Sequence, residues 1–206
     1  MNQEEFQPDK DKIVKIYTKY DVCSKCKGAC CKSYAGIYAP EDFGNNISVD
    51  YITALLLTRK FTIDFNDAIY ATDNVPTVTE KNYFIRPRHV DEGALEVSRS
   101  GVCINWSHNS GCSLSEEKRP YQCRMLVPLI EYGTPCKYKS EDKASEPDMA
   151  ERWKPYQHII KDAKRRFKIL QSIITVDEHE KNGDIDVLIE SIKFKIKALY
   201  EKEDEQ

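Results

Sequence analysis

Eight cysteines in 206 residues constrain this chain more than any other feature of its sequence. Half of them lie in one short stretch, which reads Cys23-Ser-Lys-Cys26-Lys-Gly-Ala-Cys30-Cys31. The others are spread over a loop-rich region, at Cys103, Cys112, Cys123 and Cys136. Two cysteines separated by two residues let a loop fold back so that both sulfurs face one metal ion, about 2.3 Å away. The sequence therefore predicts a metal site built from cysteine thiolates.

The N-terminal stretch favours a reducing compartment. Residues Met1 to Lys12 are polar and charged, without the apolar segment that is typical of a signal peptide. We therefore expect a cytoplasmic protein, and structural disulfides rarely persist in the cytoplasm. Metal ligation is then the usual reason for so many cysteines.

Two interpretations without metal remain open. Several of the cysteines can be buried, reduced side chains that pack as small apolar residues, and the isolated Cys136 fits this interpretation best. Alternatively, the eight cysteines can form a disulfide framework, for which the sequence does not define the pairing. We nevertheless expect metal ligation. The cysteines most strongly expected to be ligands are Cys23, Cys26, Cys30, Cys103, Cys112 and Cys123, and Cys31 and Cys136 come next.

The number of thiolates and the charges near them limit the kind of centre. Eight thiolates suffice for two four-sulfur sites, or for one iron–sulfur cluster together with one zinc. Four thiolates around a divalent ion leave a charge of about −2, which N–H donors and cations must offset. Arg119 and Arg124 flank Cys123 in the sequence and are expected to supply positive charge there. Neighbouring side chains usually point apart. Cys30 and Cys31 are therefore expected to bind two different metal centres, or only one of the two is expected to bind a metal.

The periodicity of apolar residues predicts helices around an extended middle region. Residues 9–21 and 48–60 fit short amphipathic helices, whereas residues 61–102 fit short strands or irregular β structure. From about residue 148 to the C-terminus, apolar residues recur at helical spacing on both sides of a turn at Asn182-Gly183. This pattern predicts two helices packed as a hairpin.

The expected fold class is therefore α+β. We expect an irregular, loop-rich metal-binding domain with mainly helical elements and short β strands over residues 1–140. A C-terminal helical hairpin over residues 141–206 is expected to pack on it.

Composition and missing motifs exclude several classes of function. The net charge of −3 gives no overall field that favours nucleic acid, and no apolar run approaches the ~20 residues of a membrane span. The basic run from Lys161 to Lys168 fits a solvated helix face better than a patch for acidic partners or RNA. The chain has no P-loop and no G-x-G-x-x-G loop. The partners that remain are an unidentified protein partner or a redox partner.

The cysteine-containing segments resemble the YkgJ-type cysteine-cluster family, a bacterial zinc- or iron-chelating domain with a C-x2-C-x3-C-C signature. The similarity runs from Cys23 to about Cys136, roughly the middle half of the chain. It includes Pro40-Glu41-Asp42, the stretch from Gly101-Val-Cys103 to Gly111-Cys112, and the closing Arg119-Pro120-x2-Cys123-Arg124 box. The resemblance implies an iron–sulfur cluster, or chelated zinc or iron, and a related domain occurs in the enzyme that N-methylates flagellin lysines.

Three hypotheses for function follow. The first is a protein that holds an iron–sulfur cluster, with or without zinc, for a redox, cluster-carrying or structural role. The second is a protein-lysine N-methylase-like enzyme, suggested only by the related domain, and the missing glycine loop argues against it. The third is a zinc-stabilised interaction module without catalysis, because a closed four-thiolate site leaves zinc no open coordination position.

Overall fold

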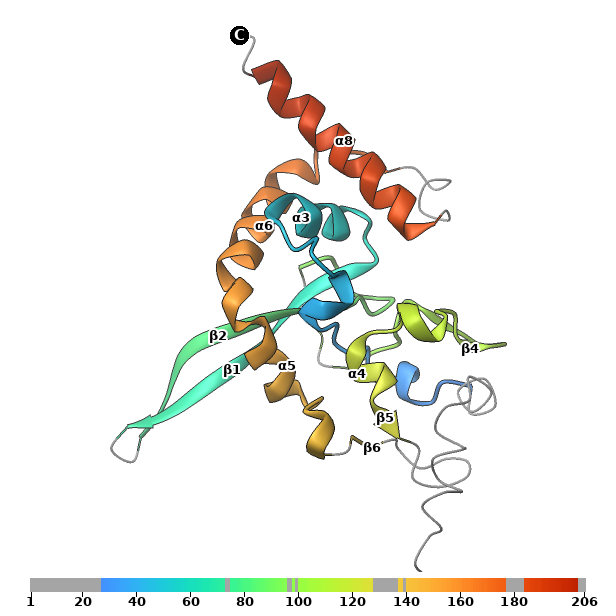
Figure 1. Ribbon diagram of the computed structural model, residues 1–206, viewed down its shortest axis with the longest axis vertical. Coiled ribbons are helices and arrows are strands. Elements are labelled where there is room, and N and C mark those ends of the chain that lie inside the picture. The colour runs from blue at the N-terminus through green and yellow to red at the C-terminus, as the bar shows by residue number, and fades with distance from the viewer. Residues whose placement is uncertain are drawn as a thin grey trace, which may run out of the picture.

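The computed structural model describes residues 27–72, 75–95, 98, 100–127, 137–138, 140–176 and 184–203. Helices alternate with loops and with three two-stranded antiparallel sheets, and the chain ends in a long helix (Figure 1). The predicted α+β, loop-rich class is therefore confirmed. The predicted helix over residues 9–21 lies outside the described residues, as do Cys23, Cys26 and Cys136. In the described part of the chain, no helix has the length and apolar composition that crossing a membrane requires.

The largest sheet is a long two-stranded ribbon, formed by β1 (Phe61–Thr72) and β2 (Val75–Pro87). The strands pair from Phe61 opposite Pro87 to Thr72 opposite Val75, with one irregularity between Ala68 and Ile69. Figure 1 shows the ribbon reaching from the body of the protein outward. The sequence predicts short strands here, and the prediction is too short because Pro76 and the polar residues near the turn interrupt the strand pattern.

The N-terminal part of the core is built around α3 (Val49–Leu57), which follows the short 3₁₀ helix η2 (Pro40–Phe43). The hydroxyl of Ser48 accepts a hydrogen bond from the backbone N–H of Tyr51, which starts α3 where the sequence predicts it. Ile52, Leu55 and Leu56 are fully buried on its inner side.

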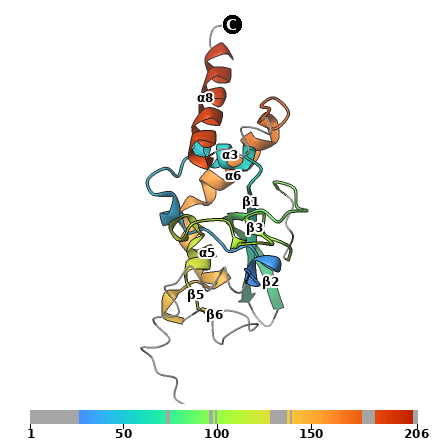
Figure 2. The same cartoon turned by 90° about the vertical axis from the view of Figure 1, so that its right-hand side faces the viewer.

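The C-terminal part consists of α5 (Glu146–Trp153), the 3₁₀ turn η5 (Lys154–Tyr156), α6 (Gln157–Leu170) and α8 (Ile185–Glu203). Both α6 and α8 pack against α3, as Figure 2 shows from the side. The guanidinium of Arg166 in α6 also lies over the ring of Tyr200 in α8, 5.1 Å from its centroid. The apolar residues whose spacing predicts these helices, such as Phe167 and Ile192, are buried.

One hydrophobic core spans the predicted boundary between residues 140 and 141. Ile37, Leu55 and Phe84 from before the boundary belong to the same buried cluster as Trp153 and Ile160 from after it. The indole of Trp153 is fully buried, and its Nε1–H donates to the carbonyl oxygen of Tyr38 at 2.7 Å. The segments before and after residue 140 are therefore joined by a shared apolar interior as well as by the chain.

Candidate metal centre

Five of the eight cysteines lie in the described residues, and all five carry free thiols. Four of them come from three distant segments and gather around Ala35 and Trp106 in a small cluster of their own, separate from the main core. These four are Cys30, Cys31, Cys103 and Cys112. We call this group the thiol cluster. Cys31 and Cys103 are buried, whereas Cys30 and Cys112 are half-buried.

Short local elements bring the three segments together. Cys30 and Cys31 lie in the 3₁₀ turn η1 (Cys30–Lys32), and the N–H of Cys103 donates to the carbonyl oxygen of Cys31 at 2.7 Å. Cys112 ends a small hairpin, in which β3 (Trp106–Ser107) pairs with β4 (Gly111–Cys112). The indole of Trp106 donates to the carbonyl oxygen of Lys27 at 2.8 Å, which ties this hairpin to the turn that precedes Cys30.

The loop before Cys30 needs glycine for two reasons. Gly28 has a φ of +63°, a left-handed conformation that glycine adopts at little cost. A Cβ atom at this position would also lie 3.1 Å from a ring carbon of Trp106 and 3.3 Å from the backbone of Gly111. The close approach lets the cysteine loop lie directly against the β3–β4 hairpin.

The sulfurs of the adjacent Cys30 and Cys31 lie on the same side of the chain, 3.9 Å apart. The expectation that they point apart is therefore wrong, since both residues lie in the tight 3₁₀ turn η1. In a tetrahedral site with thiolates at 2.3 Å, neighbouring sulfurs are about 3.8 Å apart. The two sulfurs are thus spaced as two ligands of one ion would be.

Hydrogen bonds and burial set the protonation of these thiols. A hydrogen bond with Cys31, the N–H of Leu114 and the guanidinium of Arg119 together lower the pKa of Cys112 to about 6 despite burial. The hydrogen bond with Cys31 likewise lowers the pKa of Cys30 to about 7. Burial raises the pKa of Cys103 to about 11, although its sulfur accepts the N–H of Asn105. Sulfurs that accept backbone N–H groups are prepared to carry negative charge.

The two arginines predicted beside the sulfurs differ in their contacts. Arg119 is buried, and its positive charge acts on Cys112. Arg124 instead pairs with the carboxylate of Asp42, with 2.5 Å between Nη2 and Oδ1, and also donates to the carbonyl oxygen of Arg119. Arg124 therefore positions the loop that carries Arg119.

Cys123 lies in the short helix α4 (Tyr121–Arg124), with its sulfur directly against the backbone of Gly36. Its charged form is disfavoured first by burial and then by Cys30, Cys103 and Cys112, which together raise its pKa well above the usual range. The N–H of Gly36 donates to its sulfur and partly opposes this effect. All five described thiols therefore share one electrostatic neighbourhood.

A buried amide that sequence reasoning missed fixes α4 in place. The side chain of Gln122 is fully buried, accepts the N–H of Ile37 at 2.9 Å and donates to the carbonyl oxygen of Ala144 at 2.9 Å. Asp42 adds a second link, because its Oδ2 accepts the N–H of Tyr121 at 2.8 Å. The position of Gln122 beside Cys123 in the Arg119–Arg124 box was the signal that could have identified it.

We expect Gly36→Ala to be strongly destabilising and to lower metal content. A Cβ atom at position 36 would lie 2.3 Å from the Cys123 sulfur, a contact too close for the two to coexist without movement of α4. Thermal unfolding followed by circular dichroism, together with metal analysis, measures both effects. Gly44→Ala is the control for loss of a glycine, since no described residue other than its chain neighbours lies within 4 Å of the Cβ position there, although its φ of +56° adds backbone strain. Equal losses in both variants would contradict the role of close packing at Gly36.

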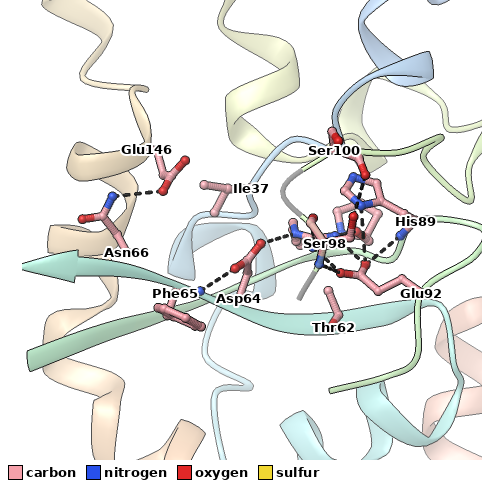
Figure 3. A network of polar contacts seen from close by, with 12 residues as sticks. Ile37, Thr62, Asp64, Phe65, Asn66, His89, Glu92, Ser98, Ser100 and Glu146 are labelled. Carbon is pink, nitrogen blue, oxygen red and sulfur yellow. Dashed lines mark hydrogen bonds and ion pairs between the residues drawn. The ribbon is translucent and has the colours of Figure 1, made fainter. Parts of the chain in front are cut away.

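A buried ion network holds the strand segment that leads to Cys103. Arg86 is 1% exposed and donates from Nε to Asp64 at 2.7 Å and from Nη2 to Glu92 at 2.6 Å. Glu92 also accepts the backbone N–H groups of His89 and Ser98, at 3.0 and 2.6 Å (Figure 3). Burial alone would raise the pKa of Glu92, but these hydrogen bonds outweigh it and lower the pKa. This network is not predictable from the sequence alone, because isolated charged residues usually lie on the surface.

The network ends next to the thiol cluster. His89 forms a β bridge opposite Cys103, flanked by backbone hydrogen bonds from Val90 to Val102 and from Ile104 to Arg88. The imidazole of His89 is buried against Gly101, and burial and Arg86 lower its pKa. Although the preceding Arg86-Pro87-Arg88 stretch in the sequence favours a surface position for His89, this histidine is buried. His108, the other histidine near the cysteines, is exposed on the β3–β4 turn with its ring edge-on to Trp106.

A metal site here would combine cysteines from the described residues with cysteines that lie outside them. In the described ranges, no group of three or more His, Cys, Asp or Glu side chains is placed to hold a metal ion. The chemistry of the donors nevertheless suits zinc or iron, because these thiols accept N–H groups, lie beside Arg119 and include a pair with the spacing of two ligands. Cys23 and Cys26, the C-x2-C pair of the motif, lie outside the described residues.

The fold and the site together define a loop-rich α+β protein with a compact group of reduced thiols beside its main core. No family model matches the chain, and neither a curated protein nor a solved structure matches it.

Proposed function

We propose that this protein binds metal through its cysteine thiolates, as an iron–sulfur cluster or as zinc, in a redox, cluster-carrying or structural role. The observation that carries the proposal is the convergence of Cys30, Cys31, Cys103 and Cys112, far apart in sequence, into one cluster of free thiols. Reduced cysteines can pack as small apolar side chains in any core, whereas a group of thiols that accept N–H donors and lie beside Arg119 is suited to a soft ion.

Each described cysteine has a role in this proposal. Cys30, Cys31, Cys103 and Cys112 would hold the metal together with Cys23 and Cys26, which belong to the same motif. Cys123 would join them from the side of Gly36, and Cys136 completes the set of eight. Arg119 and the N–H groups of Asn105, Leu114 and Gly36 would offset the negative charge of the sulfurs.

The spacing of Cys30 and Cys31 bears on the kind of centre. In a four-iron cluster with four cysteines, each iron carries a single cysteine, so no two cysteine sulfurs share an iron. Zinc takes up to four thiolates on one ion, and each iron of a two-iron cluster takes two. The separation of 3.9 Å therefore supports zinc or a two-iron cluster for this pair. An iron–sulfur cluster would supply one-electron chemistry, whereas closed zinc would supply only stability.

The proposal includes membership of the YkgJ-type cysteine-cluster family. It also includes a location in the cytoplasm, where thiols stay reduced. No observation favours lysine N-methylation over metal binding alone.

Elemental analysis of the full chain, purified without oxygen, tests the proposal when combined with acid-labile sulfide and a visible spectrum. Iron with sulfide and broad absorbance near 400 nm indicates a cluster, and colourless protein with stoichiometric zinc indicates a structural site. A preparation that contains neither metal, and that takes up neither zinc nor iron with sulfide on reconstitution, would reject metal binding.

A further inference from the structure

The imidazole of His89 is a buried polar group whose two ring nitrogens are unpaired. The residue is 2% exposed, and neither Nδ1 nor Nε2 has a hydrogen-bond partner among the described residues. A neutral imidazole has one N–H donor and one nitrogen lone pair, and folded proteins rarely leave such groups unsatisfied in their interior. The buried ring of His89 therefore requires an explanation that its packing alone does not give.

Backbone pairing places His89 beside a cysteine of the thiol cluster. His89 and Cys103 are opposite each other in an antiparallel bridge, and the backbone hydrogen bonds flank this pair instead of joining it. In such a pair both side chains leave the backbone on the same face, with Cβ atoms about 5 Å apart. Gly101, two residues before Cys103, leaves room for the ring, since a Cβ atom there would lie 2.9 Å from Cγ of His89.

A carboxylate lies next to one of the two ring nitrogens. Oε2 of Glu92 is 3.7 Å from Nδ1 of His89, and the same oxygen accepts the backbone N–H of His89 at 3.0 Å (Figure 3). Histidines that bind a metal almost always direct their other nitrogen to a carboxylate, a carbonyl or water, which fixes the orientation of the ring. With Nδ1 directed to Glu92, Nε2 is the nitrogen that is left to bind a ligand.

The charge of the buried network favours a cation near this ring. The network pairs one guanidinium, that of Arg86, with two carboxylates, those of Asp64 and Glu92. Its ion pairs alone therefore leave one negative charge unbalanced, and Glu92 is the carboxylate that contacts His89. A metal ion on the far side of the imidazole would offset this charge.

We propose that His89 is a ligand of the metal that the thiol cluster holds, and that it binds through Nε2 beside Cys103. The inference rests on the proposed function, because it adds a nitrogen ligand to a site of thiolates. Three cysteines and one histidine are a common ligand set for structural zinc, and histidines replace cysteines on one iron of some two-iron clusters. Neutral imidazole in place of one thiolate changes the charge of a zinc site from about −2 to about −1.

X-ray absorption at the zinc or iron edge tests the proposal on the full chain, purified without oxygen and without a histidine tag. The outer atoms of a bound imidazole give scattering that thiolates do not give. The wild type is expected to show sulfur ligands together with imidazole. The imidazole signal is expected to persist in His108→Ala, which changes the exposed histidine of the β3–β4 turn, and to be lost in His89→Gln. His89→Gln is also expected to lower metal affinity by about tenfold or more.

Metal with sulfur ligands and no imidazole in the wild type would overturn this inference and leave the proposed function intact. An imidazole signal that remains in folded His89→Gln, or that disappears in His108→Ala, would overturn it too. A wild type that takes up neither zinc nor iron rejects both proposals together.

Circular dichroism shows whether His89→Gln is folded. If it is not, a variant in which the other three histidines, His108, His158 and His179, are changed to alanine decides instead. An imidazole signal in that variant can come only from His89 and supports the proposal, whereas its loss rejects the proposal.

Discussion

Glu92→Gln is expected to lower the free energy of unfolding by about 3 kcal/mol or more. The substitution keeps the size of the side chain but removes the charge that Arg86 contacts through both Nη atoms, at 2.6 and 2.9 Å. Arg86 would remain buried with Asp64 as its only carboxylate partner in the network, and an incompletely paired buried charge is costly. Urea unfolding of the purified wild type and variant under the same conditions, followed by circular dichroism, measures the change.

The chain offers a matched control for this substitution. Glu190 forms an ion pair with Lys193 on α8, but the Glu190 side chain is 68% exposed. Because exposed ion pairs contribute little, Glu190→Gln is expected to change stability by less than about 0.5 kcal/mol. A Glu92→Gln variant as stable as Glu190→Gln would show that Arg86 does not require the charge of Glu92 and is satisfied by its other acceptors, among them the carbonyl oxygens of Pro87 and Ser98.

Cys112→Ser is expected to lower metal affinity by more than about tenfold. Substitution of residues that only hydrogen-bond to metal ligands already lowers affinity by about tenfold or more. The hydroxyl replaces a thiolate whose pKa is about 6 and which the Leu114 N–H and Arg119 stabilise in its charged form. A serine hydroxyl stays protonated at neutral pH and is a poor ligand for zinc or iron. Metal content after purification and competition with a chelator give the affinity.

His108→Ala is the control for the cysteine substitution. Its side chain is exposed on the same β3–β4 hairpin, four residues before Cys112, and the variant is expected to keep wild-type metal content. Full metal content in Cys112→Ser would remove Cys112 from the ligands. Loss of metal in His108→Ala would instead show that the turn supplies a ligand.

Periodicity predicted the elements whose apolar faces are buried. The helix from Val49 to Leu57 and the helices that carry Phe167 and Ile192 were predictable, because their apolar residues recur at helical spacing and pack inward. The α+β class followed from the alternating residues around Ile63 and Phe84. Element lengths were less accurate in the ribbon, where pairing between strands extends past residues that are poor strand formers on their own.

The arrangement of the site depended on long-range contacts that no local pattern encodes. The motif spacing placed Cys30 and Cys31 near a centre, but Cys103 joins them only through the backbone pairing of residues 31 and 103. Likewise, Gln122 and Arg86 are polar residues whose burial depends on partners far away in the sequence. Sequence reasoning assigns such residues to the surface because unpaired polar groups are rarely buried.

Because the thiol cluster is separate from the main apolar core, we expect the cluster to open without unfolding of the core. The main core, from Ile37 to Ile196, is built from aliphatic and aromatic contacts, and none of the five described cysteines belongs to it. Metal release would therefore act first on the smaller unit around Ala35 and Trp106, as a subglobal opening of the kind that amide hydrogen exchange detects. The helices and the ribbon base would persist as a scaffold on which the cysteine loops can be loaded again.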